Sequence, residues 1–477
     1  MLSKRGPIVK GGLISFEFTY NGQVLLWIFY FTLLIFTAIY GVFLLIYLIL
    51  IGIFLVIATG LQGFKIVDRL LTLPHEHRMI AIFLMAFILR AVMFFQTQEI
   101  CPDLGRYVER SQLMMAGQVP YRDFYGGNKP PLYEFMLWLM GVTVGPGIVQ
   151  FRAVFSFFDA LIAVVLFLVC RLKYDARFSV TAAMIYAIFP IGIITIGLSG
   201  HYDSVVVFFT MLSLLLLFRK RLEFSGLALG IAFGLKLYPI VLLPFFLSTI
   251  KTWRERILYA LLFLLPTVLA NGLLYVVSPA AFDAYMTEGT GWTGLVSIPR
   301  TIELMFGVTE ILSIKITWWV LGIFGLLILW LLFDWLFLER EKNLIKWFKI
   351  IIILFVIHNG FYIMFGFLFY KFSMLVALLA VSTYFLVTVY LLIKHLHRIT
   401  PASLNRPESE QLFIVSTYAI LLFLFGLANY APWYFLWFFP YLLAIKTDKI
   451  RYAILWIFPW RGVGRYMRLL PGTPRVN

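Results

Sequence analysis

Four polar clusters interrupt an otherwise apolar sequence, and each contains side chains that could bind or act on a polar substrate. The first begins at Asp103, in the longest polar segment of the chain, residues 101–150. The others are His201-Tyr202-Asp203-Ser204, Lys236-Leu237-Tyr238-Pro239, and residues 429–434. A carboxylate can accept the proton of a substrate hydroxyl, and a cation can neutralise a phosphate. These clusters are therefore the first candidates for a functional site.

Each cluster also has a purely structural interpretation when it is taken alone. Asp103 could be the N-cap of a helix over residues 104–116, because aspartate is favoured at that position. The second cluster could be a polar helix cap, and Lys236 could extend its ammonium group to a membrane interface. Residues 432–434 could belong to an aromatic belt. Because the topology below places all four clusters on one side of a membrane, we favour a shared site.

The composition defines the class of protein that carries these clusters. Of the 477 residues, 62% are apolar and 13% are charged, whereas soluble chains are about half apolar and a quarter charged. The apolar residues form repeated blocks of 15–25, long enough to cross a bilayer as helices. The blocks run almost to the end of the chain without strand-like alternation, which argues against a secreted soluble protein and an outer-membrane barrel. We predict an all-α polytopic membrane protein with about 12–14 transmembrane helices.

The distribution of basic residues predicts the orientation of these helices. In the predicted topology, 29 of the 39 Lys and Arg residues lie in cytoplasmic loops or termini, and residues 101–150 and 278–313 form outer loops. Pro239 divides the segment 224–250 into two short limbs, because proline disfavours a continuous helix. The predicted spans are a hairpin within 23–60, then 79–98, 151–170, 178–197, 203–218, 224–238, 239–250, 257–277, 314–338, 347–369, 372–393, 412–427 and 433–445.

Ten basic residues do not fit the cytoplasmic loops, and ionisable groups at membrane depth or on the outer face are functional candidates. They are Arg90, Arg106, Arg110, Arg122, Lys129, Arg152, Lys236, Arg300, Lys315 and Lys371. The remaining positive charge, within a net charge of +16, is explained by basic cytoplasmic loops, so we expect no nucleic-acid partner. The two cysteines fall on opposite sides of the predicted membrane, and no His pair has zinc-ligand spacing.

Several motifs follow one another in a recognisable order. They are Asp103 with Gly117 to Phe124, Lys129-Pro130-Pro131-Leu132-Tyr133, His201 to Ser204, Ser225 to Pro239, and Pro432-Trp433-Tyr434 with Trp437 and Pro440. In this order and spacing the chain resembles polyprenol-phosphate-sugar-dependent glycosyltransferases of the integral-membrane C superfamily (GT-C). It is most similar to prokaryotic mannosyltransferases and the first mannosyltransferase of the glycolipid-anchor pathway. The Lys-Pro-Pro-Leu-Tyr motif also resembles the aminoarabinose and protein-mannosyl branches, so the sugar stays open.

The resemblance implies a reaction. A polyprenyl-phosphate-linked hexose, with mannose as the first candidate, enters from the bilayer as the donor. The hexose is transferred with inversion to an acceptor hydroxyl at the outer or lumenal face, and this hydroxyl belongs to a glycan, glycolipid or protein. Such a displacement needs a base for the hydroxyl and charge compensation for the leaving phosphate. In the family that the chain resembles, the base is the first acidic residue of the outer loop after the preceding span, which is Asp103 in this sequence. Because Asp103-Leu104-Gly105 lacks the second acid of some relatives, we expect no obligatory metal, with a divalent ion on carboxylate and phosphate oxygens as the alternative.

The resemblance also implies roles for other residues and a domain organisation. Residues 79–445 would form the catalytic domain, after an N-terminal hairpin and cytoplasmic loop over 1–78 and before a basic cytoplasmic tail over 446–477. Asp123 would be structural, because it lies in a turn-rich loop. The candidates for the donor phosphate are Lys236, Arg300 and Lys371, and those for substrate binding are His201, Tyr202, Asp203 and Tyr238, with Arg106 and Lys129 as weaker ones.

Two other classes of protein are compatible with the hydropathy. A transporter or lipid flippase would suit a broken helix and intramembrane charges such as Arg90, Asp159 and Lys236. Internal repeats and a midplane polar site are typical of transporters, whereas here no half-to-half similarity is seen and the polar residues gather at the outer boundary. A non-catalytic scaffold would not need Asp103 or the cations. We therefore favour the transferase.

Overall fold

The computed structural model describes residues 65–94, 102–126, 129–288, 410–426 and 432–445. These residues form α-helices with short 3₁₀ and π segments, and no strand occurs within these ranges. The all-α architecture predicted from the sequence is confirmed. The predicted spans at 23–60, 314–338, 347–369 and 372–393 lie outside the described residues, as do most of the second outer loop and the basic tail.

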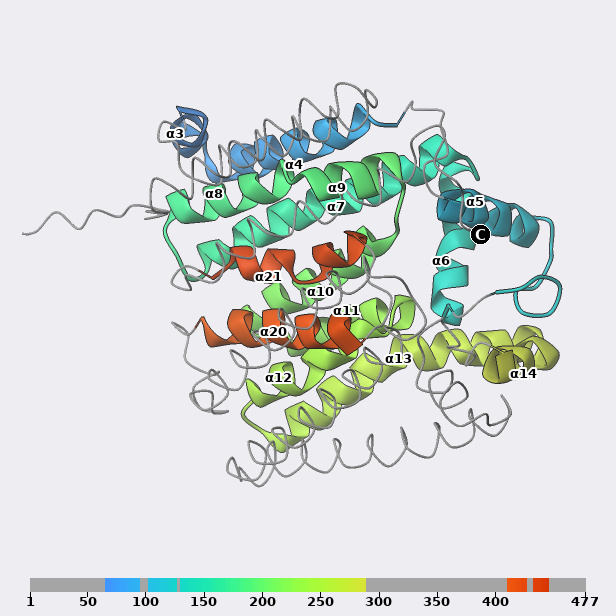
Figure 1. Cartoon of the computed structure of the whole chain (residues 1–477). Helices are drawn as coiled ribbons and strands as arrows, with labels where there is room; N and C mark the ends of the chain where they lie inside the picture. The colour runs from blue at the N-terminus through green and yellow to red at the C-terminus, as the bar shows by residue number, and fades with distance from the viewer. Residues whose placement is uncertain (1–64, 95–101, 127–128, 289–409, 427–431, 446–477) are drawn as a thin grey trace, which may run out of the picture.

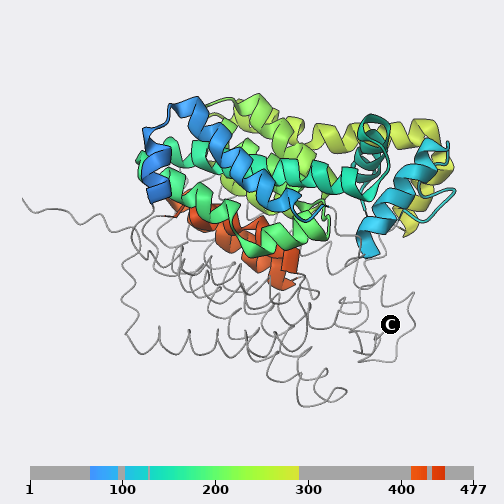
Figure 2. The ribbon, with the colours of Figure 1, turned by 90° about the horizontal axis from the view of Figure 1, so that it is seen from above.

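The longer helices lie side by side in a bundle, and three helices gather at one end of it (Figures 1 and 2). α5 (Pro102–Met115), α6 (Pro131–Val144) and α14 (Pro279–Glu288) form this end, which we call the polar end; α3 (Lys65–Thr72) lies at the opposite end. The bundle comprises α4 (His75–Ala91), α7 (Ile148–Arg171), α8 (Ala176–Ala187), α10 (Asp203–Phe218), α11 (Leu222–Leu235), α13 (Trp253–Val277), α20 (Gln411–Gly426) and α21 (Phe439–Leu443).

Two of the described helices, α7 and α13, are long and apolar enough to cross a membrane. They differ in their surroundings, because 61% of the most apolar window of α7 is buried but only 11% of that of α13. α7 is thus a central helix, whereas α13 keeps apolar side chains such as Leu261, Val268 and Leu269 exposed. An exposed apolar face of this length suits contact with lipid.

Prolines interrupt the helices at three places. The predicted break after α11 is confirmed: Lys236 has an extended backbone, and the 3₁₀ segment η2 (Tyr238–Leu242) leads into α12 (Leu243–Ser248). The predicted span 178–197 is not one helix, because α8 ends before Pro190 and is followed by the short α9 (Pro190–Gly192) and the π segment η1 (Ile193–Leu198). The residue before a proline is driven out of helical geometry, which explains the interruption.

The last predicted span, 433–445, is likewise divided. The 3₁₀ segment η3 (Pro432–Trp437) precedes α21, which has Pro440 near its start. A proline is tolerated in the first turn of a helix, where its missing N–H would have no partner in any case. The interrupted segments matter for function because two of them, at Lys236 and at Trp437, supply side chains to the site described below.

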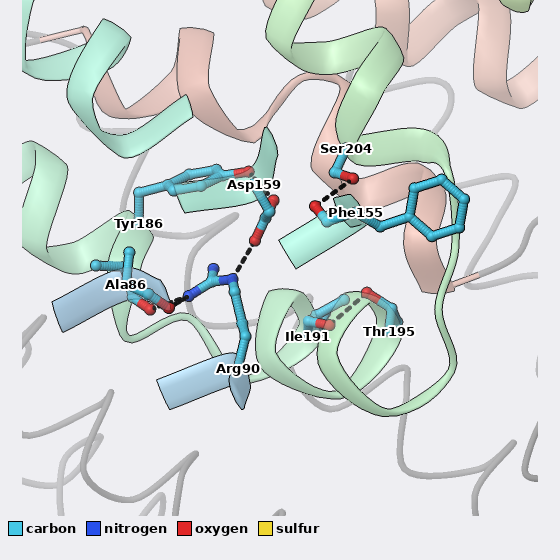
Figure 3. Close-up of polar contacts among 9 residues, drawn as sticks. Ala86, Arg90, Phe155, Asp159, Tyr186, Ile191, Thr195 and Ser204 are labelled. Carbon is cyan, nitrogen blue, oxygen red and sulfur yellow. Dashed lines mark hydrogen bonds and ion pairs between the residues drawn. The ribbon is translucent and has the colours of Figure 1, made fainter. Parts of the chain in front are cut away.

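A buried ion pair joins α4 to α7 (Figure 3). Arg90 Nε bonds an oxygen of Asp159, and both side chains are fully buried. Tyr186 Oη donates to the other oxygen of Asp159 at 2.7 Å, and Arg90 Nη1 donates to the carbonyl of Ala187 at 2.7 Å. Gly192 packs against this group so closely that an added Cβ would lie 3.0 Å from Arg90 Nη2. Arg90 and Asp159 therefore neutralise each other within the packed core. Their charges are explained by this ion pair and no longer favour a transporter.

We expect Asp159→Ala to lower the free energy of unfolding by about 3–5 kcal/mol, because it leaves the Arg90 guanidinium buried without a counter-charge. The double variant Arg90→Met/Asp159→Leu removes both charges, so its free energy of unfolding should fall much less than that of the single variant. Thermal unfolding in detergent measures both. Equal losses in the single and double variants would show that packing, and not the ion pair, stabilises this region.

α11 and α13 approach each other closely through glycines of α11. An added Cβ at Gly226 would lie 2.9 Å from the carbonyl oxygen of Tyr259, and at Gly230 only 2.2 Å from that of Phe263. Ser213 Oγ of α10 shares buried hydrogen bonds with Ser225 Oγ at 3.0 Å and with Tyr259 Oη at 3.2 Å, which tie α10 to the same pair. Small residues allow such close helix packing in membranes.

Gly230→Ala is expected to destabilise the protein by about 1–3 kcal/mol, because the methyl group would have to displace a backbone carbonyl. Gly272 in α13 is the matched control, since a Cβ there would meet nothing within 4 Å. Gly272→Ala should be neutral or stabilise slightly through helix propensity. The midpoint of thermal unfolding distinguishes the two, and an equal response of both variants would contradict this packing argument.

Candidate functional site

The polar end of the bundle brings together residues from four separate parts of the sequence. Asp203 is the first residue of α10, Lys236 follows α11, Lys129 precedes α6, and Trp437 ends η3. Lys236 Nζ bonds Asp203 Oδ1 at 2.7 Å, and Trp437 Nε1–H donates to the same oxygen. The exposed fractions of the Asp203 and Lys236 side chains are 1% and 14%. A carboxylate and a cation thus form a nearly buried pair just below the surface of the site.

Aromatic rings surround the Lys236 ammonium. Its Nζ lies 5.2 Å from the ring centre of Tyr202, 4.8 Å from that of Tyr434 and 4.6 Å from that of Trp437. Tyr238 stacks on Trp437 with ring centres 4.1 Å apart and planes inclined by 8°. Rings at these distances attract a cation through the negative faces of their π-systems. Asp203 and the rings together fix Lys236 in one position.

Lys129 is the second cation of the site. Its Nζ lies 5.7 Å from the ring centre of Tyr202, and among the described residues no carboxylate oxygen lies within 4.0 Å of it. Burial, followed by repulsion from Lys236, lowers the pKa of Lys129 to about 8, with Asp203 and Asp103 acting in the opposite direction. Lys129 therefore shares an electrostatic environment with all three of these groups, yet has no ion-pair partner of its own there.

Asp103 differs from Asp203 in its accessibility. Its side chain is 36% exposed, and its nearest ion partner is Arg106 Nη1 at 3.8 Å. The N-cap interpretation required Asp103 to be the residue just before the helix. Asp103 lies instead within the first turn of α5, after Pro102, so that interpretation is wrong. The next residue, Leu104, packs against the turn before α10, where a Cβ at Gly200 would lie 2.8 Å from its side chain. This contact holds Asp103 near the Asp203–Lys236 pair.

Contacts between α5 and α6 support this arrangement. Arg110 Nη1 donates to Glu134 Oε1 at 2.6 Å and to the carbonyl of Gly126 at 2.9 Å. Burial raises the pKa of Glu134 to about 7, although Arg110 acts in the opposite direction. Ser111 Oγ donates to the carbonyl of Leu137 at 3.0 Å. The two helices are thus joined along their length, so Asp103 and Lys129 are held on one unit.

The loop between these helices is held by local hydrogen bonds. Tyr121 has a φ of 67° and donates its hydroxyl to the carbonyl of Lys129 at 2.6 Å. Asp123 Oδ2 accepts from the Val119 amide at 2.7 Å, and both Asp123 oxygens bond Arg122 at 2.8 Å. The hydrogen bond from Arg122 lowers the pKa of Asp123 to about 2, and that from Val119 contributes. These contacts agree with the structural role expected for Asp123.

The remaining predicted residues lie in three kinds of place. Five of them lie together at the site: Tyr202, Asp203, Lys236, Tyr238 and Lys129. Arg106 is different, because its side chain is 68% exposed and its ion partner is Asp103. His201 is buried in the turn before α10, where its amide donates to the Thr195 carbonyl at 3.1 Å. Arg300 and Lys371 lie outside the described residues.

Sequence reasoning did not name Trp437 or Tyr434 among the substrate- or phosphate-binding residues, although both lie in a motif that carried the resemblance. The signal was their proximity to the proline at 432, which marks an interrupted helix.

Among the described residues, no group of three His, Cys, Asp or Glu side chains could hold a metal ion.

Comparison with known proteins finds similar sequences among glycosyltransferases. Residues 130–358 match the model of glycosyltransferase family 87. GPI mannosyltransferase 1 of Eremothecium gossypii is 31% identical over 144 residues, which cover 29% of this chain and 32% of that protein. GPI mannosyltransferase 1 of Kluyveromyces lactis is 32% identical over 130 residues, 26% of this chain and 30% of that protein. The matched part of the chain thus spans about a third of these relatives. No solved structure matches the chain.

An all-α bundle whose acidic and basic side chains meet at one end defines a class of membrane protein that could act on a polar, anionic substrate. Within that class, these matches confirm the predicted resemblance to integral-membrane glycosyltransferases of the C superfamily, on the mannosyltransferase side. The family match and the apolar helices also support a membrane location.

Proposed function

We propose that the protein is a polyprenol-phosphate-sugar-dependent hexosyltransferase, with mannose as the first candidate sugar. The observation that carries the proposal is the shared electrostatic environment of Lys129, Lys236, Asp203 and the accessible Asp103 at the polar end of the bundle. A base and two cations there suit the transfer of a sugar away from a phosphate. The similarity to glycosyltransferase family 87 and to two proteins named mannosyltransferases gives independent support.

Asp103 is the carboxylate that suits the role of base. A base must reach the hydroxyl that it deprotonates, and Asp103 is partly exposed with only a 3.8 Å contact to Arg106. Asp203 is buried, and one of its oxygens is already bonded to Lys236 and Trp437. In the proposed step the acceptor oxygen attacks the anomeric carbon and Asp103 takes its proton. The carbon–oxygen bond to phosphate breaks on the opposite face, and polyprenyl phosphate leaves with inversion.

Lys129 and Lys236 would compensate the charge of the leaving phosphate. The geometry favours a larger role for Lys129 than the sequence suggested, because its ammonium has no ion-pair partner among the described residues. Lys236 contributes positive charge while Asp203 holds it in place. Arg300 and Lys371 remain candidates for the same role. No metal is required in this scheme, and a divalent ion bridging carboxylate and phosphate stays the alternative.

The remaining parts of the proposal concern location and partners. The protein would be a multi-pass membrane protein with both termini in the cytoplasm and this site on the outer or lumenal face. The acceptor would be a hydroxyl of a glycan, glycolipid or protein. A transporter of lipid-linked substrates is the competing function.

The test uses purified protein in nanodiscs with radiolabelled polyprenyl-phosphate-mannose and a crude lipid acceptor extract, with and without a chelator. We expect transfer of label to an acceptor in both conditions. Loss of transfer on chelation would assign a metal to the site. If folded protein transfers neither mannose nor any other sugar from a panel of lipid-linked donors, the transferase proposal fails and the transporter takes its place.

A further inference from the structure

One oxygen of the buried Asp203 carboxylate has no partner. Its Oδ1 accepts hydrogen bonds from Lys236 and Trp437, whereas its Oδ2 is buried and accepts from no described residue. Buried carboxylate oxygens are normally satisfied, because they have lost water and need a donor in its place. The missing donor therefore points to a ligand that is bound during function.

The surroundings restrict the chemistry of that donor. A phosphate is unsuitable, because it would face the carboxylate charge. A further cation is not needed, since Lys236 bonds the carboxylate and Lys129 adds positive charge to the same environment. The Tyr202 hydroxyl is also buried without a hydrogen-bond partner, which adds a group that can both donate and accept. A neutral hydroxyl group fits these requirements.

Asp203 lies close beneath the surface of the site. Lys236, which is bonded to its other oxygen, is 14% exposed, and Tyr434, whose ring centre lies 4.8 Å from the Lys236 ammonium, is only partly buried. A ligand that contacts Lys236 is therefore one side chain away from the Asp203 carboxylate.

We propose that Asp203 Oδ2 accepts a hydrogen bond from a hydroxyl group of the substrate sugar, so that Asp203 helps to select the sugar. This inference rests on the proposed function, in which Lys129 and Lys236 hold the phosphate of the same lipid-linked donor. If the hydroxyl belongs to the donor sugar, the cations and the carboxylate bind different parts of one molecule. The hydroxyl belongs either to the donor sugar or to a sugar acceptor, and the two sources can be separated experimentally.

The experiment compares intact polyprenyl-phosphate-mannose with its 2-, 3-, 4- and 6-deoxy analogues, in competition with radiolabelled donor bound to protein in nanodiscs. It is run on wild type, on Asp203→Asn and on Glu109→Gln as the control for loss of an exposed carboxylate outside the site. In wild type, removal of one hydroxyl should weaken binding by about tenfold or more, because hydrogen bonds to charged groups are strong. In Asp203→Asn the same removal should cost less than about threefold, while Glu109→Gln should behave as wild type.

A second arm measures transfer to methyl α-mannoside and its monodeoxy analogues. A penalty that disappears in Asp203→Asn only in this arm assigns the hydroxyl to the acceptor. If Asp203→Asn does not fold, Asp203→Glu replaces it, since it keeps the charge beside Lys236 but moves the oxygens.

The inference is overturned if no deoxygenation matters in wild type in either arm, or if the penalty is the same in the Asp203 variant. If wild type binds no intact lipid-linked sugar, the proposed function fails together with it. Binding of intact donor, together with indifference to every hydroxyl in both arms, would overturn the inference alone.

Discussion

Asp103→Asn is expected to lower the rate of sugar transfer by about 10²–10⁴-fold, the range typical for loss of a general base. The amide occupies nearly the same volume but cannot take the proton of the acceptor hydroxyl. Because Asp103 lies on the exposed side of the site, donor affinity should change little. The measurement is kcat and donor KM in nanodiscs, together with thermal unfolding to verify that the variant folds.

Glu109→Gln is the matched control for this prediction, since Glu109 is an exposed acid on the same helix as Asp103. It should retain the kcat of wild type. If Asp103→Asn also transfers sugar at a rate within about threefold of wild type, Asp103 is not the base. A loss of donor affinity with unchanged kcat would instead make it a binding residue.

The helices of the described region were largely predictable because most of them are long, nearly continuous apolar blocks. The predicted span 203–218 coincides with α10 (Asp203–Phe218), and the break near Pro239 was identified from proline chemistry. The division of 178–197 was missed, because the apolar composition of that segment is continuous and Pro190 was not weighed against it. Apolar composition predicts that a segment is buried but does not decide whether it is one helix or two.

The identity of the polar clusters could be predicted, but the pairing of their side chains could not. Asp203 and Trp437 are 234 positions apart, and Arg90 and Asp159 are 69 apart. Such contacts depend on how helices pack and not on local pattern. For this reason the sequence ranked Lys236 above Lys129 for the phosphate. The structure pairs Lys236 with Asp203 and leaves Lys129 without a carboxylate partner among the described residues.

Donor binding is expected to weaken as the pH rises through about 8, the pKa to which burial and the neighbouring Lys236 lower Lys129. Below this pH the ammonium is charged and attracts the donor phosphate; above it the neutral amine does not. The charged fraction falls about tenfold between pH 7 and 9, so donor KM should rise by up to about tenfold over the same range. A phosphodiester keeps its single charge throughout, so the change must come from the protein.

Substitution of Lys129 separates this effect from other titrations. Lys129→Arg keeps a positive charge at all these pH values and should remove the rise in KM, because arginine does not lose its proton in this range. Lys129→Met should have a KM about tenfold or more above wild type at pH 7 and little further change up to pH 9, because the charged hydrogen bond is already lost. If the rise persists unchanged in Lys129→Arg, another group titrates, and Lys129 does not hold the phosphate. A KM in Lys129→Met that equals the wild-type value at pH 7 and rises as in wild type up to pH 9 would exclude any contribution of this lysine to donor binding, since its charge would then be irrelevant at every pH.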